Sequence, residues 1–226
     1  MQNLKRSMAY LAISMLSLSV YAEHEKQLPK SPKYVMLMRH AEKTAHKEEV
    51  HFEQWHLKNA QPLSTKGEER AEALTEFFTR DPEMLKYGSI FELFAPNPAK
   101  NYLEVRPIQT ITPLSKKIHK KVQHPYDLGQ EAKLVQYILN RHEYFGKTIL
   151  ICYEHKHIPV LANFFVAQTK SSGISIPQAW PFSDTSASEA EEIFDRIWVL
   201  EFDIETGRIV AFYNLPQRLM FGDATA

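Results

Sequence analysis

Two side chains that can handle phosphate, Arg39 and His40, stand together in the sequence directly after an apolar run. Arginine presents a planar fork of N–H donors that matches phosphate oxygens. A neutral imidazole can attack phosphorus and carry the phosphoryl group covalently. The pair therefore predicts an anion-binding and nucleophilic corner at the end of a strand. A strand that simply ends in polar residues would have the same local sequence, so this stretch alone leaves both interpretations open.

Further basic residues occupy comparable places elsewhere in the chain. His155 follows the apolar run Thr148–Tyr153, and Arg106 precedes Pro107. Proline suits the first turn of a helix, where free backbone N–H groups also favour anions. Two imidazoles facing across an arginine-lined pocket would suit phosphoryl transfer, because the arginines supply the positive charge that stabilises the transferring group. Such a scheme requires neither a metal ion nor a cofactor.

The elements that must position these corners alternate along the chain. Short apolar runs predict strands, and apolar residues at helical spacing predict helices between them. Strands are expected at Tyr34–Met38, Ser89–Ala95 and Thr148–Tyr153, with an edge strand at Val122–Pro125 and a final β-hairpin formed by Arg196–Phe202 and Arg208–Tyr213. Helices are expected at about 64–79, 107–118, 130–145 and 159–168. This order predicts an α/β sandwich with helices on both faces of a sheet, whose ligands collect at the carboxyl ends of the strands.

Residues 44–63 are polar and aromatic and show no clear periodicity, which predicts a long loop or short helices near the site. His46, His51 and His56 lie five residues apart in this segment. That spacing would place them on different faces of a helix, unlike the i, i+4 histidine pairs that bind zinc. We therefore expect no metal site here, and we interpret residues 44–63 and 169–190 as loops that shape the substrate site.

Composition and charge narrow the class of protein. The 226 residues suit one sizeable domain, and a content of 44% hydrophobic and 24% charged residues is typical of globular proteins. Equal numbers of basic and acidic residues, 27 of each, provide no basic field for nucleic acid. The expected partner is therefore a small phosphorylated substrate. Cys152 is the single cysteine, so no intramolecular disulfide can form, and we expect it to be a buried structural thiol.

The N-terminal segment has the pattern of a secretory signal. Lys5 and Arg6 precede the apolar stretch Met8–Val20, which is short for a membrane span, and a small-x-small cleavage pattern ends at Ala22. We expect residues 1–22 to be cleaved, leaving a secreted or periplasmic protein without stable membrane insertion. Residues 23–32 are expected to be a flexible lead-in, followed by one domain over residues 33–226.

Four short motifs, in the same order, resemble those of the histidine phosphatase superfamily in its phosphoglycerate-mutase-like branch. Met38–Lys43 resembles the Arg-His-Gly signature, Leu63–Ala71 the leucine–threonine–x–x–glycine helix start, Arg106–Thr110 the second arginine with its Gln-Thr pair, and Ile149–His155 the strand that carries the second histidine. The resemblance covers about residues 33–214. It implies a three-layer α/β/α sandwich, in agreement with the order of strands and helices.

The resemblance also implies roles for individual residues. His40 would be the nucleophile and phosphohistidine carrier, Arg39 and Arg106 would bind the phosphoryl oxygens, and His155 would be the second pocket histidine. Lys43, which ends the first motif, is a further phosphate-binding candidate.

Several positions depart from the family pattern or leave a role open. Ala41 replaces the glycine that usually follows the nucleophile, and Lys156 replaces a glycine that often follows the second histidine. Glu154 or His157 could face the nucleophile in place of His155, which we favour. A carboxylate at this place would put a like charge beside the phosphate and disfavour activity.

The acid that protonates the leaving group is a glutamate after the second arginine in the mutase-like branch. Asp127 and Glu131 lie in that region, and Glu131 is the catalytic candidate that we carry forward. A solvated carboxylate at a helix start would have the same sequence.

We therefore expect a secreted or periplasmic, metal-independent phosphatase that hydrolyses a small phosphomonoester through a phosphohistidine at His40. The competing expectation is a catalytically weak or inactive protein of the same fold that binds phosphorylated ligands or an envelope partner. A metal-binding protein built on residues 44–63 is not favoured.

Overall fold

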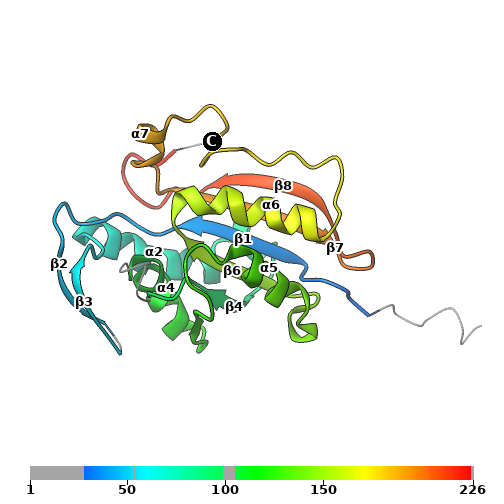
Figure 1. Cartoon of the computed structure of the whole chain (residues 1–226), viewed down its shortest axis with the longest axis horizontal. Coiled ribbons are helices and arrows are strands. Elements are labelled where there is room, and N and C mark those ends of the chain that lie inside the picture. The colour runs from blue at the N-terminus through cyan, green and yellow to red at the C-terminus, as the bar shows by residue number, and fades with distance from the viewer. Residues whose placement is uncertain (1–27, 53, 99–104, 225–226) are drawn as a thin grey trace, which may run out of the picture.

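The computed structural model describes residues 28–52, 54–98 and 105–224, and the expected signal segment 1–22 lies outside them. Six strands form the central sheet: β1 Tyr34–Arg39, β4 Ile90–Phe94, β5 Val122–Gln123, β6 Thr148–Tyr153, β7 Arg196–Asp203 and β8 Arg208–Pro216. Their order is β5-β4-β6-β1-β7-β8, and all of these strands except β5 are labelled in Figure 1. The first four strands of this order are parallel, whereas β7 is antiparallel to β1 and β8 to β7. The predicted C-terminal hairpin is confirmed.

Helices connect these strands. They are α2 Thr65–Arg80, α3 Pro82–Leu85, α4 Arg106–Lys117, α5 Glu131–Leu139, α6 Ile158–Gln168 and α7 Ala187–Ala190, with short 3₁₀ turns η1 His142–Tyr144 and η2 His155–His157. Helix α2 begins where the sequence predicts it, because the Ser64 side chain accepts a hydrogen bond from the N–H of Gly67 and caps the first turn.

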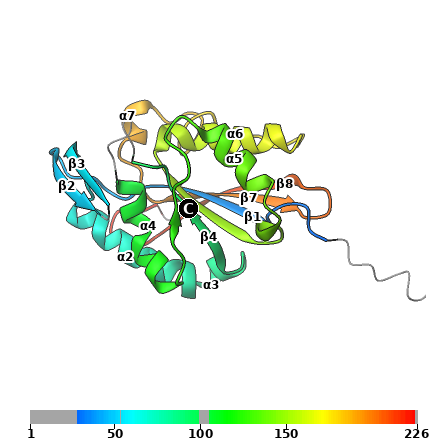
Figure 2. The ribbon, with the colours of Figure 1, turned by 60° about the horizontal axis from the view of Figure 1, so that its bottom comes forward.

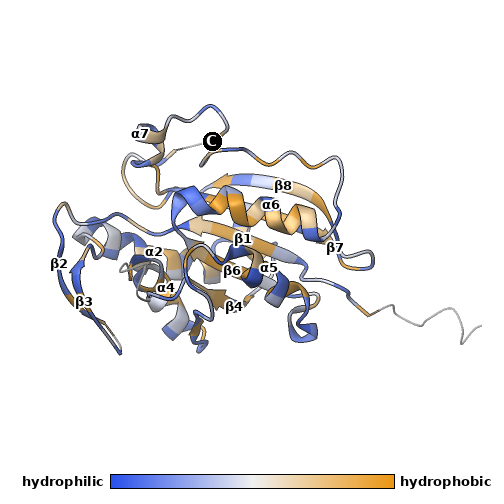
Figure 3. Ribbon diagram, viewed as in Figure 1, coloured by the Kyte–Doolittle hydropathy of each residue, from blue (hydrophilic) through white to orange (hydrophobic). Residues whose placement is uncertain are grey.

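The two faces of the sheet bury different side chains, because successive residues of a strand point in opposite directions. In β1, Val35 and Leu37 pack with the apolar side chains of α5 and α6. Met36 and Met38 pack with those of α2, α3 and α4 on the other face. Figure 2 shows the two helical layers above and below the sheet. Hydrophobic colour marks β1, β6 and much of helix α6 in Figure 3. The expected three-layer α/β/α sandwich is confirmed.

Residues 44–63 were predicted to be a loop or short helices, and this is wrong for most of the segment. Strands β2 Glu48–Phe52 and β3 Trp55–Ala60 form a separate antiparallel hairpin. Val50 and Leu57 on its inner face pack with Val105, which precedes α4. Only a few inward-facing side chains of this hairpin are apolar. The alternation of apolar and polar residues was therefore too short to identify the strands from the sequence. The hairpin lies at the same end of the molecule as the carboxyl end of β1 (Figure 1).

The helix predicted over residues 130–145 is shorter than expected, since α5 ends at Leu139. The N–H of Asn140 caps it by donating to the carbonyls of Gln136 and Ile138. The chain then forms the 3₁₀ turn η1, in which Tyr144 is buried with its ring against that of Phe94 of β4. Burial of this tyrosine explains why the apolar pattern continued past the end of the helix.

Two further features concern the ends of the fold. The N–H of Lys30 donates to the carbonyl of Ile204 at 2.7 Å, and the carbonyl of Ser31 accepts from the N–H of Gly146 at 2.7 Å. The end of the expected lead-in is thus hydrogen-bonded to the β7–β8 turn and to the loop before β6. Cys152 is fully buried, as predicted, and burial raises the pKa of its thiol. Within the described ranges, no helix is both long and apolar enough to cross a membrane.

Candidate active site

His40 stands directly after β1, at the carboxyl end of the strand. Its backbone N–H donates to the carbonyl of Tyr153 at 3.0 Å, which fastens this corner to the end of β6. The ring Nδ1 lies 2.8 Å from the carbonyl oxygen of Ala41. Because a carbonyl can only accept, Nδ1 carries the proton in this contact and Nε2 is left with its lone pair. The local backbone therefore selects the tautomer that a nucleophilic Nε2 needs.

Arg106 contacts that lone pair from the start of α4. Its Nε lies 3.3 Å from Nε2 of His40 and donates to it, and its Nη1 donates to the carbonyl of Gln61 at 2.9 Å. Arg106 is the first residue of the helix and Pro107 the second, which is the placement that the Arg-Pro sequence predicts. With an exposure of only 3%, Arg106 adds a buried positive charge beside the imidazole.

The surroundings of His40 favour its neutral form. Burial, followed by the positive charges of Arg106 and Arg39, holds the pKa of His40 well below its ordinary value of 6.5. The hydrogen bond to Ala41 acts in the opposite direction but does not outweigh these effects. These effects favour the unprotonated imidazole at neutral pH, which is the reactive state of a nucleophile.

The Gln109-Thr110 pair fixes two loops around the nucleophile. The Thr110 hydroxyl accepts from the N–H of Ala41 at 2.9 Å and donates to the carbonyl of Arg106 at 2.8 Å. Gln109 Oε1 accepts from the N–H of Leu63 at 3.2 Å. Ala41 does not adopt a positive φ, so this turn has no need of glycine. The sequence only matched the Gln-Thr pair to a motif. The structure shows that Thr110 links the turn after His40 to the first turn of α4, which carries Arg106.

Arg39 is held rigidly beside His40. Its Nη1 donates to the carbonyls of Ala190, at 2.6 Å, and Ile193, at 3.0 Å, and its guanidinium lies 3.9 Å from the ring centroid of Phe194. Burial lowers its pKa to about 10, against the raising effect of Glu191. Its buried Nε has no hydrogen-bond partner among the described residues. The two hydrogen bonds of Nη1 are thus made to the backbone, whereas the N–H of Nε is left as a donor that could bind an anion.

His155 lies in the second corner, at the start of η2. Its charge lowers the pKa of His40, and its side chain is buried at 4% exposure. Its Nε2 has no hydrogen-bond partner within the described part of the chain. Nδ1 lies 2.8 Å from Glu154 Oε1, although the angle falls outside hydrogen-bond geometry. Glu154 also accepts from the N–H of Lys156 at 3.2 Å, as the cap of η2.

Glu131 and His157 form a pair of their own. The carboxylate Oε1 accepts from His157 Nδ1 and from the N–H of Gly129, both at 2.8 Å. Burial would raise the pKa of Glu131, but these hydrogen bonds lower it. The hydrogen bond to Glu131 in turn raises the pKa of His157. Glu131 is therefore an ionised carboxylate bonded to His157, and no contact joins it to His40. Asp127 lies at the preceding turn, where its N–H donates to Gln130.

Lys43 is paired with an acid instead of being directed at the nucleophile. Its Nζ lies 2.9 Å from Glu191 Oε2, while Lys156 Nζ lies 3.6 Å from the other oxygen. The hydrogen bond from Lys43 leads the effects that lower the pKa of Glu191 to about 2, and the charge of His155 contributes as well. One carboxylate thus lies among several of the basic groups that the sequence assigned to phosphate.

No protein-family model matches the sequence, and no curated protein matches it. Among solved structures the chain is similar to the protein histidine phosphatase SixA complexed with tungstate, with 16% identity and a TM-score of 0.48 over 81% of this chain and 97% of that one. It is also similar to SixA from Agrobacterium tumefaciens, with 13% identity and a TM-score of 0.45 over 80% and 97%.

A third similar structure is phosphoglycerate mutase from Bacillus anthracis str. Sterne, with 10% identity and a TM-score of 0.41 over 82% of this chain and 94% of that one. These neighbours are histidine phosphatase superfamily members. At these identities and scores, the chemistry of this chain must be argued from its own side chains.

The predicted substrate-shaping loop 169–190 ends too early, because Glu191, Ile193 and Phe194 also contribute to the site, beside Ala190 at the end of the predicted range. This segment precedes β7, and Ile197 of β7 pairs with Met38 at the end of β1. Because β7 is antiparallel to β1, its beginning lies at the carboxyl end of the parallel strands. The predicted C-terminal hairpin would have placed this segment at the site if the pairing of β7 with β1 had been known. The Phe194 ring lies 6.1 Å from the His40 ring between centroids.

Sequence reasoning also missed a buried arginine that supports the corner. Arg70 of α2 donates from Nε and Nη2 to both carboxylate oxygens of Glu42, at 3.0 and 2.9 Å. The same guanidinium donates to both oxygens of Asp223, at 2.8 and 2.7 Å. Arg70 thereby ties the turn after His40 to the C-terminal tail. A cavity of about 280 Å³ lies alongside, lined in part by Glu42, Arg70 and Phe194.

Proposed function

We propose that the protein is a phosphatase that hydrolyses a small phosphomonoester through a phosphohistidine at Nε2 of His40. The observation that carries the proposal is the state of this imidazole. Its proton is held at Nδ1 by the carbonyl of Ala41, and Nε2 is contacted by Arg106. A buried neutral imidazole with a fixed tautomer and an adjacent guanidinium is suited to accept a phosphoryl group.

The reaction then has two steps. In the first, the Nε2–P bond forms as the P–O bond to the leaving alcohol breaks, and the alcohol oxygen takes up a proton. In the second, water attacks phosphorus, the Nε2–P bond breaks, and inorganic phosphate leaves. We assign the stabilisation of the phosphoryl oxygens to Arg106, Nε of Arg39 and Nε2 of His155, since donors fixed in a buried site stabilise developing charge strongly.

Protonation of the leaving alcohol is the step for which the side chains of the protein offer the least support. Glu131 is ionised and bonded to His157, so in this arrangement it has no proton to give. We propose that the preferred substrates are those whose leaving group needs little protonation. An aryl phosphate, whose leaving phenol is acidic, should therefore react faster than an alkyl phosphate.

The charge of Glu191 and Glu154 favours a second candidate, a protein of the same fold that binds phosphorylated ligands without turnover. Glu191 is paired with Lys43, and Glu154 lies against His155. Two carboxylates among the basic groups would slow reaction of an anionic substrate. This alternative predicts vanadate or phosphate binding that is weakened by Arg106→Gln, together with no hydrolysis.

The deciding experiment uses the full chain with p-nitrophenyl phosphate and a panel of alkyl phosphates, in the presence of EDTA. Turnover is expected in the wild type and its loss in His40→Ala, while His142→Ala, which changes an exposed histidine in η1, should retain the wild-type rate. Labelling with radioactive phosphate should yield an acid-labile phosphoenzyme only when His40 is present. Thermal unfolding of His40→Ala at the wild-type temperature would show that the fold is intact.

Hydrolysis that persists in a folded His40→Ala variant would overturn the phosphohistidine mechanism. Vanadate binding without any turnover across the panel would favour the binding protein instead.

We also propose that the protein is exported. The support is the sequence pattern of residues 1–22, with its basic start, apolar stretch and cleavage site after Ala22. N-terminal sequencing of protein recovered outside the cytoplasm should begin at Glu23. Recovery of exported material that still begins at Met1 would contradict the cleavage site.

A further inference from the structure

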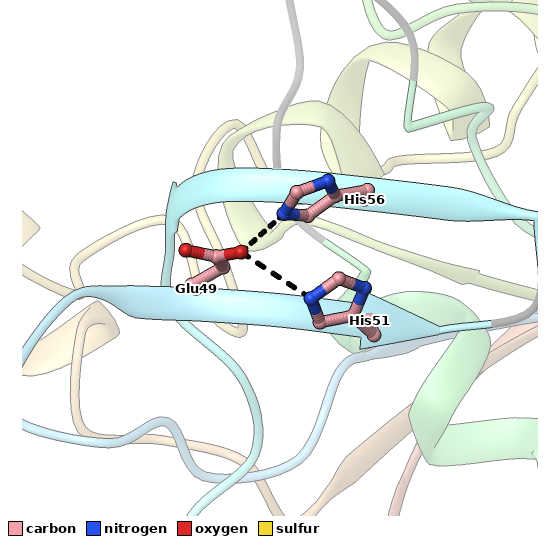
Figure 4. Close-up of side chains that lie close together, drawn as sticks. All are labelled: Glu49, His51 and His56. Carbon is pink, nitrogen blue, oxygen red and sulfur yellow. Dashed lines mark hydrogen bonds and ion pairs between the residues drawn. The ribbon is translucent and has the colours of Figure 1, made fainter.

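The hairpin formed by β2 and β3 gathers three potential metal ligands on one face. His51 and His56 are directly opposite in the strand register, and their rings stack with centroids 4.1 Å apart and planes inclined by 17°. Glu49 lies two residues before His51, so its side chain leaves the same face of β2. Figure 4 shows the carboxylate directed at the Nε2 atoms of both rings.

The five-residue spacing of the histidines does not exclude a metal site, because the segment is a hairpin and not a helix. Residues five apart point in different directions on a helix, but His51 and His56 flank the turn of a hairpin and become cross-strand neighbours. His46, the third histidine of the segment, precedes β2 and is not part of this cluster. The geometry therefore separates a pair that can act together from a histidine that cannot.

We propose that Glu49, His51 and His56 form a binding site for a divalent transition-metal ion of the zinc type. Nε2 of each imidazole and Oε1 of the carboxylate would be the ligands, with water completing a tetrahedral shell. Imidazole nitrogen combined with carboxylate oxygen is a donor set that zinc accepts, and three protein ligands leave one position open. This proposal does not depend on the phosphatase chemistry at His40.

The distances fit this assignment. The three ligand atoms all lie within 4.8 Å of one another. Zinc bonds of about 2.0–2.1 Å at tetrahedral angles separate neighbouring ligand atoms by about 3.3 Å, and Glu49 Oε1 lies 3.3 Å from His51 Nε2. Glu49 Oε1 is also hydrogen-bonded to His56 Nε2, and this contact would have to lengthen as the ion enters.

The site is open to solvent. The side-chain exposures of His51, His56 and Glu49 are 71%, 49% and 55%. An ion can therefore enter without unfolding the chain, and small side-chain rotations can adjust the ligands. An isolated two-stranded hairpin is marginally stable in water, so an ion bridging β2 and β3 would stabilise their pairing.

Binding should be measured on tag-free full-length protein, stripped with EDTA and dialysed, by calorimetric titration with zinc chloride. A high-affinity zinc equivalent is expected in the wild type. His51→Ala, His56→Ala and Glu49→Gln should each weaken that equivalent by at least about tenfold, since even partners that only orient a ligand are worth that much. His46→Ala is the matched control, and it should bind as the wild type does.

A second measurement keeps the result independent of folding defects. Zinc should raise the unfolding temperature of the wild type and of His46→Ala, because binding to the folded state stabilises it, and it should leave His51→Ala/His56→Ala unchanged. Wild-type protein that binds no zinc, variants that bind it equally well, or an equal loss in His46→Ala would overturn the proposal. The phosphatase assay in EDTA is unaffected by these outcomes, so the two proposals fail separately.

Discussion

Nε of Arg106 donates to Nε2 of His40 at 3.3 Å, and the same guanidinium donates from Nη1 to the carbonyl of Gln61 at 2.9 Å. One side chain therefore contacts the candidate nucleophile and the residue that follows the β2–β3 hairpin. The contact to Nε2 must break before phosphorus can approach, because the lone pair that accepts it is the one that attacks. Arg106 is then left beside the phosphoryl group with its charge and donors available to the oxygens.

Replacing Arg106 by glutamine should lower kcat/KM by about 10²–10³-fold, the usual cost of removing one fixed donor from a site of charge development. The pH profile should change as well. His40 reacts when neutral, so activity falls as the pH drops through its lowered pKa. Since the charge of Arg106 helps to lower that pKa, Arg106→Gln should move the acidic limb of the kcat/KM profile to higher pH.

Arg141→Gln is the control for this prediction, because Arg141 is exposed and paired with the nearby Glu143. It should leave both the rate and the acidic limb in place. An Arg106→Gln variant whose rate falls while the limb stays fixed would show that Arg106 has no electrostatic effect on the nucleophile.

Much of the fold follows from short patterns in the sequence. The buried runs Val35–Met38 of β1 and Ile149–Cys152 of β6 are apolar, and such strands occur in parallel sheets covered on both faces. The order of strands and helices therefore predicted the layers, and the strand ends predicted the edge of the sheet at which His40 and Arg106 meet. The hairpin at residues 48–60 escaped prediction because its inner face has so few apolar residues.

The environment of the site was harder to predict than its position. The contacts of Arg39 come from Ala190, Ile193 and Phe194, more than 150 residues away in the chain. These residues lie beside Arg39 because β7 pairs with β1 in an antiparallel register, and no local pattern of the sequence specifies that pairing. The pairing of Lys43 with Glu191 has the same origin, because a charged side chain shows no preference for one partner until the fold is known.

Replacing Glu191 by glutamine should tighten the binding of vanadate or phosphate. Its carboxylate holds Lys43 at 2.9 Å and stays ionised down to a pH near its pKa of about 2. Removing the charge should lower the vanadate Kd by about two- to fivefold, the range expected when a partly exposed ion pair ceases to compete. Equilibrium titration of the folded protein measures this directly.

The gain should require Lys43, so the double variant Lys43→Met/Glu191→Gln should lose it. Glu205→Gln, in the exposed β7–β8 turn, should bind vanadate as the wild type does. Unchanged binding in Glu191→Gln would mean that this carboxylate does not compete with the anion.

Replacing Arg70 by methionine should destabilise the protein by about 3–5 kcal/mol, because it removes the buried guanidinium that pairs with the carboxylates of both Glu42 and Asp223. Urea unfolding measures the loss. Arg80→Met is the control, since its ion pair with Glu76 is largely exposed, and it should cost about 0–1 kcal/mol.

The effect of Arg70 should depend on pH in a defined direction. Burial raises the pKa of Asp223, but the hydrogen bond from Arg70, the hydrogen bonds from the N–H groups of Met220 and Leu219 and the charge of Arg70 together outweigh it and leave this pKa below the ordinary value of 3.8. The ion pair of Arg70 and Asp223 therefore stabilises the fold at pH values above the pKa of Asp223 in the unfolded chain. This stabilisation is lost as the pH falls through the pKa of Asp223 in the folded protein. The difference between wild type and Arg70→Met should narrow below about pH 4. A difference that stays constant there would show that Asp223 does not carry the effect.

Replacing Gly67 by alanine should destabilise the protein, although alanine is the better helix former by about 1 kcal/mol. A Cβ at this position would lie 2.2 Å from the carbonyl oxygen of Glu42, a backbone atom that cannot rotate away. The same carbonyl accepts from the N–H of Ser64 at 2.9 Å, so relief of the clash would disturb the start of α2. We expect a net loss of about 1–3 kcal/mol in urea unfolding.

The turn that carries Glu42 begins at His40, so Gly67→Ala should also lower kcat in protein that remains folded. Glu69→Ala tests an exposed position of the same helical turn, and it should change stability by no more than about 0.5 kcal/mol. Equal stability of Gly67→Ala and Glu69→Ala would show that the close approach of α2 to Glu42 is not what this position requires. A loss of stability without loss of kcat would instead separate the packing of α2 from the geometry of the nucleophile.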